Sequence, residues 1–382
     1  MSASVSGNPD ARSRRSAMQG ARVRRIAPAA LALIIGAWAS VAYVAAPAAD
    51  THKYEQQRLT RNAKYFAPPA YRNELRGGPV MVTFLGTTTL LFDDGKTQFL
   101  IDGFLTRPRL LSSIRVQTNK RRVREILEQA GVDQRKLQAV FVSHSHYDHA
   151  MDVAYIAQHY RSTILYGSLS TQNIGRGADI PPERNRLFHA GEEIPVGPQE
   201  DPDNRFSVTV LDSRHSTPTL FPGYIERPLR QPTGNWHYRE GGSYDFLVRH
   251  GTHTILVRAG SNLLPARADL KDTRVEVIFL GVGRLGKENE DFRRLYFQQT
   301  VARLCPELVV PMHWDNFFRD LKHELRFAPR LLDNPAPAFD SLLWQIGELN
   351  ASGGCPKPVE FGILQGFESV ALFRQPPQTS SP

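Results

Sequence analysis

The sequence has only two cysteines, Cys305 and Cys355, among its 382 residues. So few thiols argue against a metal site built from thiolates, and neither cysteine could carry a lipid after an N-terminal signal. An exported chain could join the two in one disulfide. However, residues this far apart in the sequence need not be neighbours, so buried free thiols are the open alternative. We also detect no internal repeat.

Little of the net charge lies in the body of the chain. The formal net charge is +9, but residues 1–49 contain six arginines and one aspartate, so they contribute +5 and leave only +4 for the rest. The basic composition therefore does not indicate a nucleic-acid partner. A nucleic-acid-processing protein would also be expected to carry a recognisable second domain, and we see none.

The beginning of the chain has the pattern of an export signal or a membrane anchor. Residues 1–25 form a basic region, and residues 26–49 form an uncharged, alanine-rich apolar run. A bilayer crossing needs about 20 such residues, so the run is either a signal peptide or a transmembrane anchor. A disordered basic tail followed by a buried helix is the alternative. Because positive residues stay on the cytoplasmic side, we expect an inner-membrane-anchored or exported protein whose main domain is periplasmic or extracytoplasmic.

Three histidines and two aspartates are concentrated between His144 and Asp152. Neutral imidazoles and carboxylates are ligands that suit zinc and neighbouring transition metals. Residues 137–142 have the apolar, β-rich character of a buried strand, and residues 150–160 have helical spacing. The cluster therefore lies in a loop between a strand and a helix, where side chains can converge on one point. Solvated loop histidines are the alternative, which a single pair of histidines would favour.

The stretch from His144 to His149, His-Ser-His-Tyr-Asp-His, resembles the signature loop of the metallo-β-lactamase-fold hydrolases. Residues 80–86 and 99–102 resemble the opening strands of that fold, and two later strands end at His215 and His313. The resemblance implies an α/β protein with a four-layer αβ/βα sandwich behind the N-terminal hydrophobic segment. It also implies two ligand sets for one or two divalent metal ions, with zinc expected: one of His144, His146 and His215, the other of Asp148, His149 and His313.

One ligand position departs from the family pattern. The family has a Gly-Asp pair whose carboxylate bridges the two ions, whereas this chain has Gly260 and Ser261 there. A serine hydroxyl is a much weaker ligand than a carboxylate. Asp245 or Asp269 could reach the site from elsewhere. A single metal, a loosely held second metal, and a metal site with little turnover are all open.

The resemblance implies a metal-dependent hydrolase. A metal-activated hydroxide would attack an ester, phosphodiester, amide or lactone bond, and Asp148 would orient the hydroxide or accept its proton. Asp102, Asp152 and Asp212 are candidates for orienting the ligand histidines; ordinary turn or capping aspartates are the alternative. A catalytically impaired metal-binding or partner-binding module is the second hypothesis, because Ser261 replaces the bridging aspartate.

An irregular insertion, residues 216–242, follows His215. Long loops of this kind are usually functional or disordered. Its aromatic and basic residues suit a lid over the site, and a surface flap packed by its aromatics is the alternative. The candidate lid residues are Tyr224, Arg227, Trp236 and His237.

Short motifs in the first strands favour one branch of the superfamily. Gly86-Thr-Thr-Thr89 and Leu100-Ile-Asp102-Gly-Phe are most similar to the branch that includes N-acyl-phosphatidylethanolamine-hydrolysing phospholipase D and its bacterial relatives. The resemblance makes a small-molecule or lipid-derived substrate the expectation.

The remaining sequence predicts one catalytic domain, residues 79–375, after a linker or N-terminal arm, residues 50–78, and before a disordered tail, residues 376–382. Residues 329–338 are predicted to form a loop. Strands are predicted at 80–85, 89–92, 98–102, 138–142, 163–166, 206–211, 244–249, 253–258, 275–280, 308–311 and 368–373, and helices at 119–130, 149–159, 291–303 and 339–349.

Overall fold

The computed structural model describes residues 78–200, 205–265, 270 and 273–373. The predicted basic region, the apolar run 26–49, nearly all of the arm 50–78 and the tail 376–382 lie outside these ranges. Within them, none of the helices combines the length and the apolar character that crossing a membrane requires.

The first of two large sheets has seven strands in the order β16-β1-β2-β3-β5-β6-β7. Strands β16, β1, β2 and β3 are antiparallel neighbours, whereas β3, β5, β6 and β7 run parallel. The strands are β1 (Val80–Phe84), β2 (Leu90–Asp93), β3 (Gln98–Ile101), β5 (Leu137–Phe141), β6 (Ile164–Gly167), β7 (Asn185–Leu187) and β16 (Ser369–Leu372).

The second sheet repeats this plan, with the order β15-β14-β13-β12-β11-β9-β8. Its antiparallel half runs from β8 to β12 and its parallel half from β12 to β15. The strands are β8 (Glu193–Val196), β9 (Phe206–Asp212), β11 (Tyr244–His250), β12 (His253–Arg258), β13 (Val277–Gly281), β14 (Leu308–Met312) and β15 (Glu360–Phe361). A small third sheet pairs β4 (Arg115–Val116) with β10 (Thr233–Gly234).

Phenylalanines from the two large sheets meet in the core between them. Phe206 of β9 lies with its ring centroid 5.0 Å from that of Phe99 and 6.3 Å from that of Phe92. Phe141 and Phe246 make a similar contact at 5.8 Å. Such aromatic pairs across a sandwich bury large apolar areas and fix how the sheets face one another.

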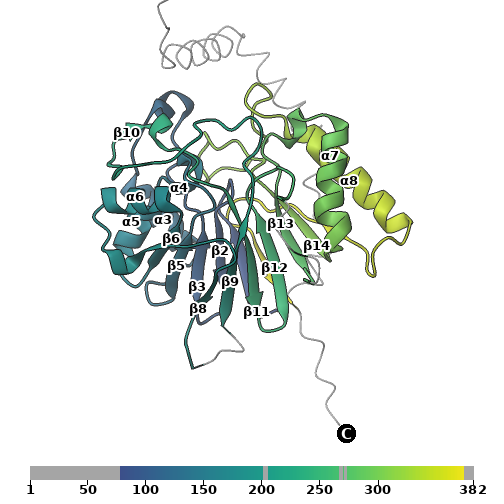
Figure 1. The fold of residues 1–382 in the computed structure, drawn as a ribbon, viewed down its shortest axis with the longest axis horizontal. Coiled ribbons are helices and arrows are strands. Elements are labelled where there is room, and N and C mark those ends of the chain that lie inside the picture. Colours follow the sequence, from purple (N-terminus) through teal and green to yellow (C-terminus); the bar gives the residue numbers. More distant parts are fainter. Residues whose placement is uncertain (1–77, 201–204, 266–269, 271–272, 374–382) are drawn as a thin grey trace, which may run out of the picture. The chain divides into compact units, whose positions relative to one another are not determined.

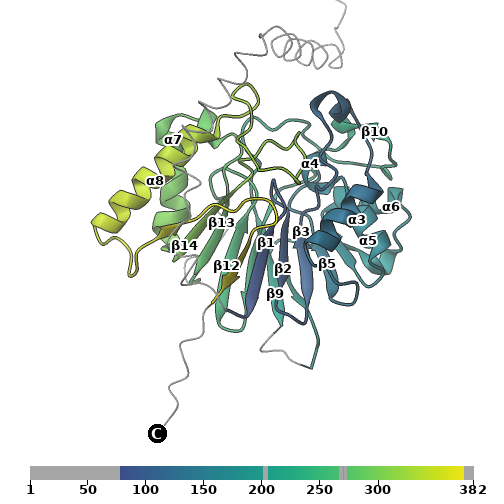
Figure 2. The same ribbon diagram turned by 180° about the vertical axis from the view of Figure 1, so that it is seen from behind.

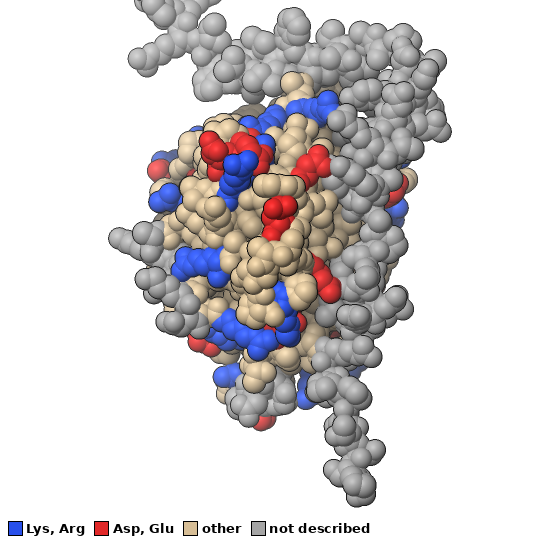
Figure 3. Space-filling view, turned by 90° about the vertical axis from the view of Figure 1, so that its right-hand side faces the viewer, with Lys and Arg blue, Asp and Glu red and all other residues tan. Residues whose placement is uncertain are grey.

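Helices cover the outer faces of both sheets. Figures 1 and 2 show α3 (Lys120–Gln129), α5 (Val153–His159) and α6 (Leu169–Gly177) beside the first sheet, and α7 (Glu290–Phe297) and α8 (Pro335–Ala351) beside the second. The helix-sheet-sheet-helix order agrees with the predicted α/β sandwich. Figure 3 shows that basic and acidic side chains are interspersed on the face toward α7 and α8.

One loop prediction and one helix prediction need correction. The predicted loop 329–338 is wrong at its end, because α8 already begins at Pro335; prolines are well suited to a first helical turn, where their missing N–H is not needed. The predicted helix 149–159 is divided into a single turn, α4 (Tyr147–Ala150), and α5. Strands β7, β8 and β15 and helix α6 were not predicted.

Cys305 and Cys355 form a disulfide, with Cα atoms 5.4 Å apart. It joins the chain just before β14 to the chain after α8. The two cysteines are therefore joined and are not buried free thiols. Neither offers a thiolate to a metal ion.

Candidate metal centre

The two sheets bring together the six predicted metal ligands. The loop after β5 carries His144 and His146, and the single turn of α4 carries Asp148 and His149. His215 follows β9, and His313 follows β14 directly. Their ligand atoms form two groups of three, each with all atoms within 4.8 Å of one another: His144, His146 and His215, and Asp148, His149 and His313.

The three-histidine group has the spacing of a metal site. His146 Nδ1 and His215 Nε2 lie 3.1 Å apart. Two nitrogens bound tetrahedrally at 2.0–2.1 Å to one ion would be separated by about 3.3 Å, so the observed spacing fits. Nε2 of the buried His144 has no hydrogen-bond partner in the described part of the chain, which is the condition of a ligand atom without its ion.

Burial favours the neutral form of the histidines of this group. Burial, followed by the charge of neighbouring histidines, holds the pKa of His144 well below its usual value and also lowers that of His146. Burial and then His146 lower the pKa of His215 to about 3. His215 Nδ1 donates to the carbonyl of Ser216 at 2.7 Å, which leaves its Nε2 lone pair directed at His146. Neutral imidazoles are the form that binds metal.

The second group combines one carboxylate with two imidazoles. Asp148 Oδ2 lies 3.4 Å from His313 Nε2 and 3.8 Å from His149 Nε2. Burial alone would raise the pKa of Asp148, but the charges of His149 and His313 hold it below its usual range. Burial would lower the pKa of His313, yet its hydrogen bond to Asp148 and the charge of Asp148 raise it. The two groups touch, since the ring centroids of His144 and His149 are 3.7 Å apart.

Asp102 holds His149 in place. The fully buried carboxylate accepts hydrogen bonds from Ser143 N at 2.7 Å, from Thr88 Oγ1 at 2.5 Å and from His149 Nδ1 at 2.8 Å. Because Nδ1 donates here, Nε2 is the acceptor and faces Asp148. The orienting role predicted for Asp102 requires a contact of this kind.

Among the described residues, no hydrogen bond joins a histidine to either of the other two predicted orienting aspartates. Asp152 accepts from the main chain of Leu105 and from both the amide and the hydroxyl of Thr106, so it fixes the loop after β3. Asp212 ends β9, where it pairs with Tyr244 of β11, and no hydrogen bond joins it to a histidine within the described ranges. Sequence reasoning missed Thr88, Arg107 and Asp315, although Thr88 lies in the Gly86-Thr-Thr-Thr89 motif.

Ser261 is buried beside the cluster, and its hydroxyl is already engaged. Ser261 Oγ lies 2.5 Å from the carbonyl oxygen of Gly283 and 2.9 Å from Ser216 Oγ. Asp245 forms a buried ion pair with Arg258 at 2.9 Å, and Asp269 lies outside the described residues. Among the described residues, no carboxylate therefore takes the place of the family's bridging aspartate.

The insertion 216–242 is attached to the loop that carries the ligands. Ser145 N donates to the carbonyl of Glu240 at 2.8 Å, and the insertion residue Tyr238 is fully buried. Among the candidate lid residues, Tyr224 and Trp236 are 64% and 39% exposed, and Arg227 is also exposed. His237 is exposed and bonds within the insertion, to Thr233 Oγ1 at 2.7 Å and to Trp236 Nε1 at 3.1 Å.

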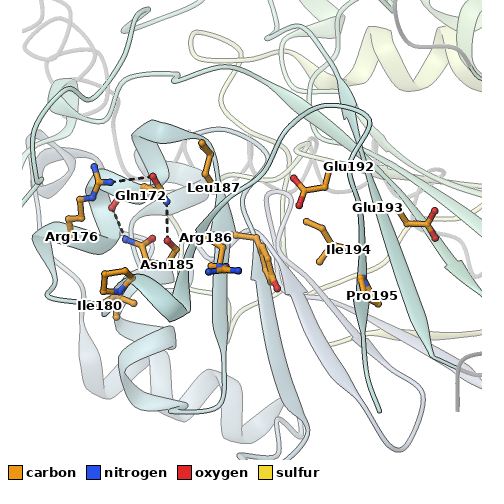
Figure 4. A pocket seen from close by; sticks show the side chains of 12 residues that line it. Gln172, Arg176, Ile180, Asn185, Arg186, Leu187, Glu192, Glu193, Ile194 and Pro195 are labelled. Carbon is orange, nitrogen blue, oxygen red and sulfur yellow. Dashed lines mark hydrogen bonds between the residues drawn. The ribbon is translucent and has the colours of Figure 1, made fainter. Parts of the chain in front are cut away.

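A separate hollow of about 520 Å³ lies between β7 and β8, the edge strands of the two sheets (Figure 4). Arg186 and Leu187 line it from β7, and Glu193 and Ile194 line it from β8. None of the six predicted ligands lines this hollow, so it is distinct from the histidine cluster.

One family model matches part of this chain. Residues 82–229 match the family model for the metallo-beta-lactamase superfamily. The matched part is less than half of the chain and includes five of the six predicted ligands.

Solved structures resemble the chain at low identity. Igni18, a metallo hydrolase from the archaeon Ignicoccus hospitalis, is 15% identical with a TM-score of 0.45, over 76% of this chain and 97% of that one. The isothiocyanate hydrolase from Delia radicum gut bacteria is 14% identical with a TM-score of 0.46, over 76% and 99%. YhfI from Bacillus subtilis is 15% identical with a TM-score of 0.44, over 76% and 98%. These similarities carry no functional conclusion. No curated protein matches the chain.

Proposed function

We propose that the protein is a metal-dependent hydrolase whose active site is the histidine cluster. The observation that supports this most strongly is the convergence of six predicted ligands, from three separate parts of the sequence, into two adjoining groups of three. His144, His146 and His215 would hold one divalent cation, and Asp148, His149 and His313 a second. The nitrogen and oxygen donors suit zinc.

The pKa shifts of the three-histidine group and of Asp148 support this proposal. A divalent ion bound here would lower the pKa of a water molecule from 15.7 to about 7 and would polarise the oxygen of the scissile bond. Neutral imidazoles at His144, His146 and His215 would leave their lone pairs free for an ion. Because its pKa lies below the usual range, the Asp148 carboxylate is ionised at neutral pH, and it would orient the attacking water or accept its proton.

The proposed substrate is a small molecule or a lipid-derived molecule with an ester, phosphodiester, amide or lactone bond. The early-strand motifs support this choice through their resemblance to the N-acyl-phosphatidylethanolamine-hydrolysing branch. Exposed Tyr224, Arg227 and Trp236 on the insertion also support it, since they would offer apolar and cationic contacts to an amphiphilic substrate. The alternative of an impaired binding module rests on Ser261 alone, and both ligand groups are assembled without a carboxylate there.

Turnover of a substrate panel tests the proposal. Purified protein supplied with zinc would be assayed with bis-p-nitrophenyl phosphate, lactones, p-nitrophenyl esters and nitrocefin. We expect hydrolysis of at least one substrate, a loss of about 100-fold or more in Asp148→Asn, and little change in Asp179→Asn, whose carboxylate is exposed and pairs with Arg230. Bound metal without turnover on any substrate would favour the binding module.

We also propose that the domain lies outside the cytoplasm, exported or anchored by residues 26–49. The basic and then apolar N-terminal sequence supports this location. The Cys305–Cys355 disulfide supports it too, because disulfides persist mainly in oxidising compartments. Fractionation of an epitope-tagged chain tests it: we expect the tag in the membrane or periplasmic fraction, and a wholly cytoplasmic tag would contradict export.

A further inference from the structure

Two buried ion pairs lie outside the two ligand groups of the histidine cluster. Arg107 pairs with Asp315, and both side chains are 0% exposed. Arg258 pairs with Asp245, and these side chains are 0% and 2% exposed. A buried ion pair is weak evidence for stability, because removing two charges from water is costly. Their burial therefore calls for another explanation, and their contacts supply one.

The Arg107–Asp315 pair is connected to His313. Arg107 also donates from Nε to the carbonyl of Arg319 at 2.7 Å and from Nη2 to that of Asn316 at 3.0 Å, so it fixes the segment that follows the histidine. Asp315 Oδ1 accepts from Thr87 N at 2.8 Å, and the carbonyl of Thr87 accepts from His313 N at 2.6 Å. The Arg107–Asp315 pair and the predicted ligand His313 thus belong to one hydrogen-bond network.

The same hydrogen-bond network reaches His149 through the turn between β1 and β2. Thr88 Oγ1 lies 2.8 Å from His149 Nδ1 and bonds to Asp102. Thr87 and His313 have positive φ angles of 53° and 59°, which side-chain-bearing residues rarely adopt without tertiary support. A Cβ at Gly86 would lie 2.1 Å from Arg107 Nη1, so the turn closes directly on the guanidinium.

The Arg258–Asp245 pair is connected to His215 instead. Arg258 Nη2 donates to the carbonyl of Asn262 at 2.8 Å, and Asn262 Nδ2 donates to the carbonyl of His215 at 2.7 Å. The guanidinium also lies over the ring of Tyr296, 5.3 Å from its centroid. This pair fixes the turn after β12 against the strand end that carries His215.

From these contacts we infer that each ion pair positions one of the two ligand groups. Arg107 and Asp315 position His313 and His149, and Arg258 and Asp245 position His215. The inference rests on the proposed function, because it assumes that both groups hold an ion. Arginine suits this role because its planar fork reaches several acceptors at once, whereas lysine presents a single ammonium group.

Cobalt binding in two single-site backgrounds tests the inference. Wild-type protein, stripped of metal, would first be titrated with Co²⁺ to count the ions. His215→Ala would then leave only the position with Asp148, His149 and His313, and His313→Ala would leave only the three-histidine position. Arg107→Lys and Arg258→Lys would be placed in each background, and Co²⁺ affinity would be read from visible absorption.

We expect each lysine variant to weaken one position by about 10-fold to 100-fold, the usual effect of losing a partner that orients a ligand. Arg107→Lys should act in the His215→Ala background and Arg258→Lys in the His313→Ala background, each with little effect in the other. Thermal unfolding without metal would check folding, and Asp315→Asn and Asp245→Asn would replace any lysine variant that fails to fold.

Equal losses in both backgrounds, or no loss in either, would overturn the inference and leave the proposed function standing. A wild-type protein that binds fewer than two Co²⁺ ions would overturn the two-ion site itself, and the inference with it.

Discussion

Asp102 and Asp152 form a matched pair for testing how the metal centre is held. Both carboxylates are 0% exposed, and both accept hydrogen bonds from main-chain amides and hydroxyls. Only Asp102 also accepts from a candidate ligand, His149 Nδ1 at 2.8 Å. Replacing each aspartate by asparagine keeps the shape of the side chain and removes its charge.

The effect of Asp102→Asn on the metal follows from the tautomer of His149. An amide nitrogen in place of Oδ2 would donate, so His149 Nδ1 could face it only by giving up its proton. The proton would then lie on Nε2, the atom that faces Asp148 Oδ2, and Nε2 could not bind a cation. We expect metal affinity at this position to fall about 10-fold to 100-fold, or about 1.4–2.7 kcal/mol.

Both substitutions should lower the free energy of unfolding by similar amounts. Each removes a charged acceptor from a buried network, in which a hydrogen bond to a charged group is worth about 1.5–3 kcal/mol. The assays are urea denaturation of the metal-free proteins and zinc competition against a chelator. Equal losses of metal affinity in Asp102→Asn and Asp152→Asn would refute the reasoning, because the effect would then come from general destabilisation.

Three further predictions concern other parts of the structure. Gly283→Ala should weaken metal binding at the position of His313 by about 10-fold, since the new Cβ would lie 2.8 Å from His313 Nδ1 and the ring would have to shift; unchanged affinity in zinc competition would contradict the packing. Ser261→Ala should lower the free energy of unfolding by about 1–2 kcal/mol but leave the metal content unchanged, because its hydroxyl bonds to Gly283 and Ser216; a lost ion would make Ser261 a ligand. Replacing Cys305 and Cys355 by serine removes a crosslink across a sequence separation of 50 residues and should cost about 4 kcal/mol in urea denaturation; an unchanged midpoint would contradict the crosslink.

The sequence predicted what depends on local pattern. The spacing from His144 to His149 predicted a metal site because four donor side chains fall in one short stretch of sequence. Strands β7 and β8 were missed because they are short, lie at sheet edges and carry polar residues. The start of α8 was missed because prolines in a first helical turn also suit a loop.

The supports of the site could not be predicted from local sequence. Arg107 and Asp315 meet across 208 positions, and nothing near either residue indicates the other. His215 and His313 were found only through the family pattern, since each is a single histidine after a strand. Folding is what brings such residues together, so their roles appear only when the two sheets are placed face to face.

Metal content of the purified protein tests the central claim most directly. Wild type, His146→Ala, His313→Ala and the double variant would be stripped of metal, exposed to excess zinc, desalted and analysed by elemental mass spectrometry, with circular dichroism as the check on folding. We predict two ions per chain in the wild type, one in each single variant and none in the double variant. A folded wild-type protein without bound metal, or single variants with the wild-type content, would contradict the two-group centre.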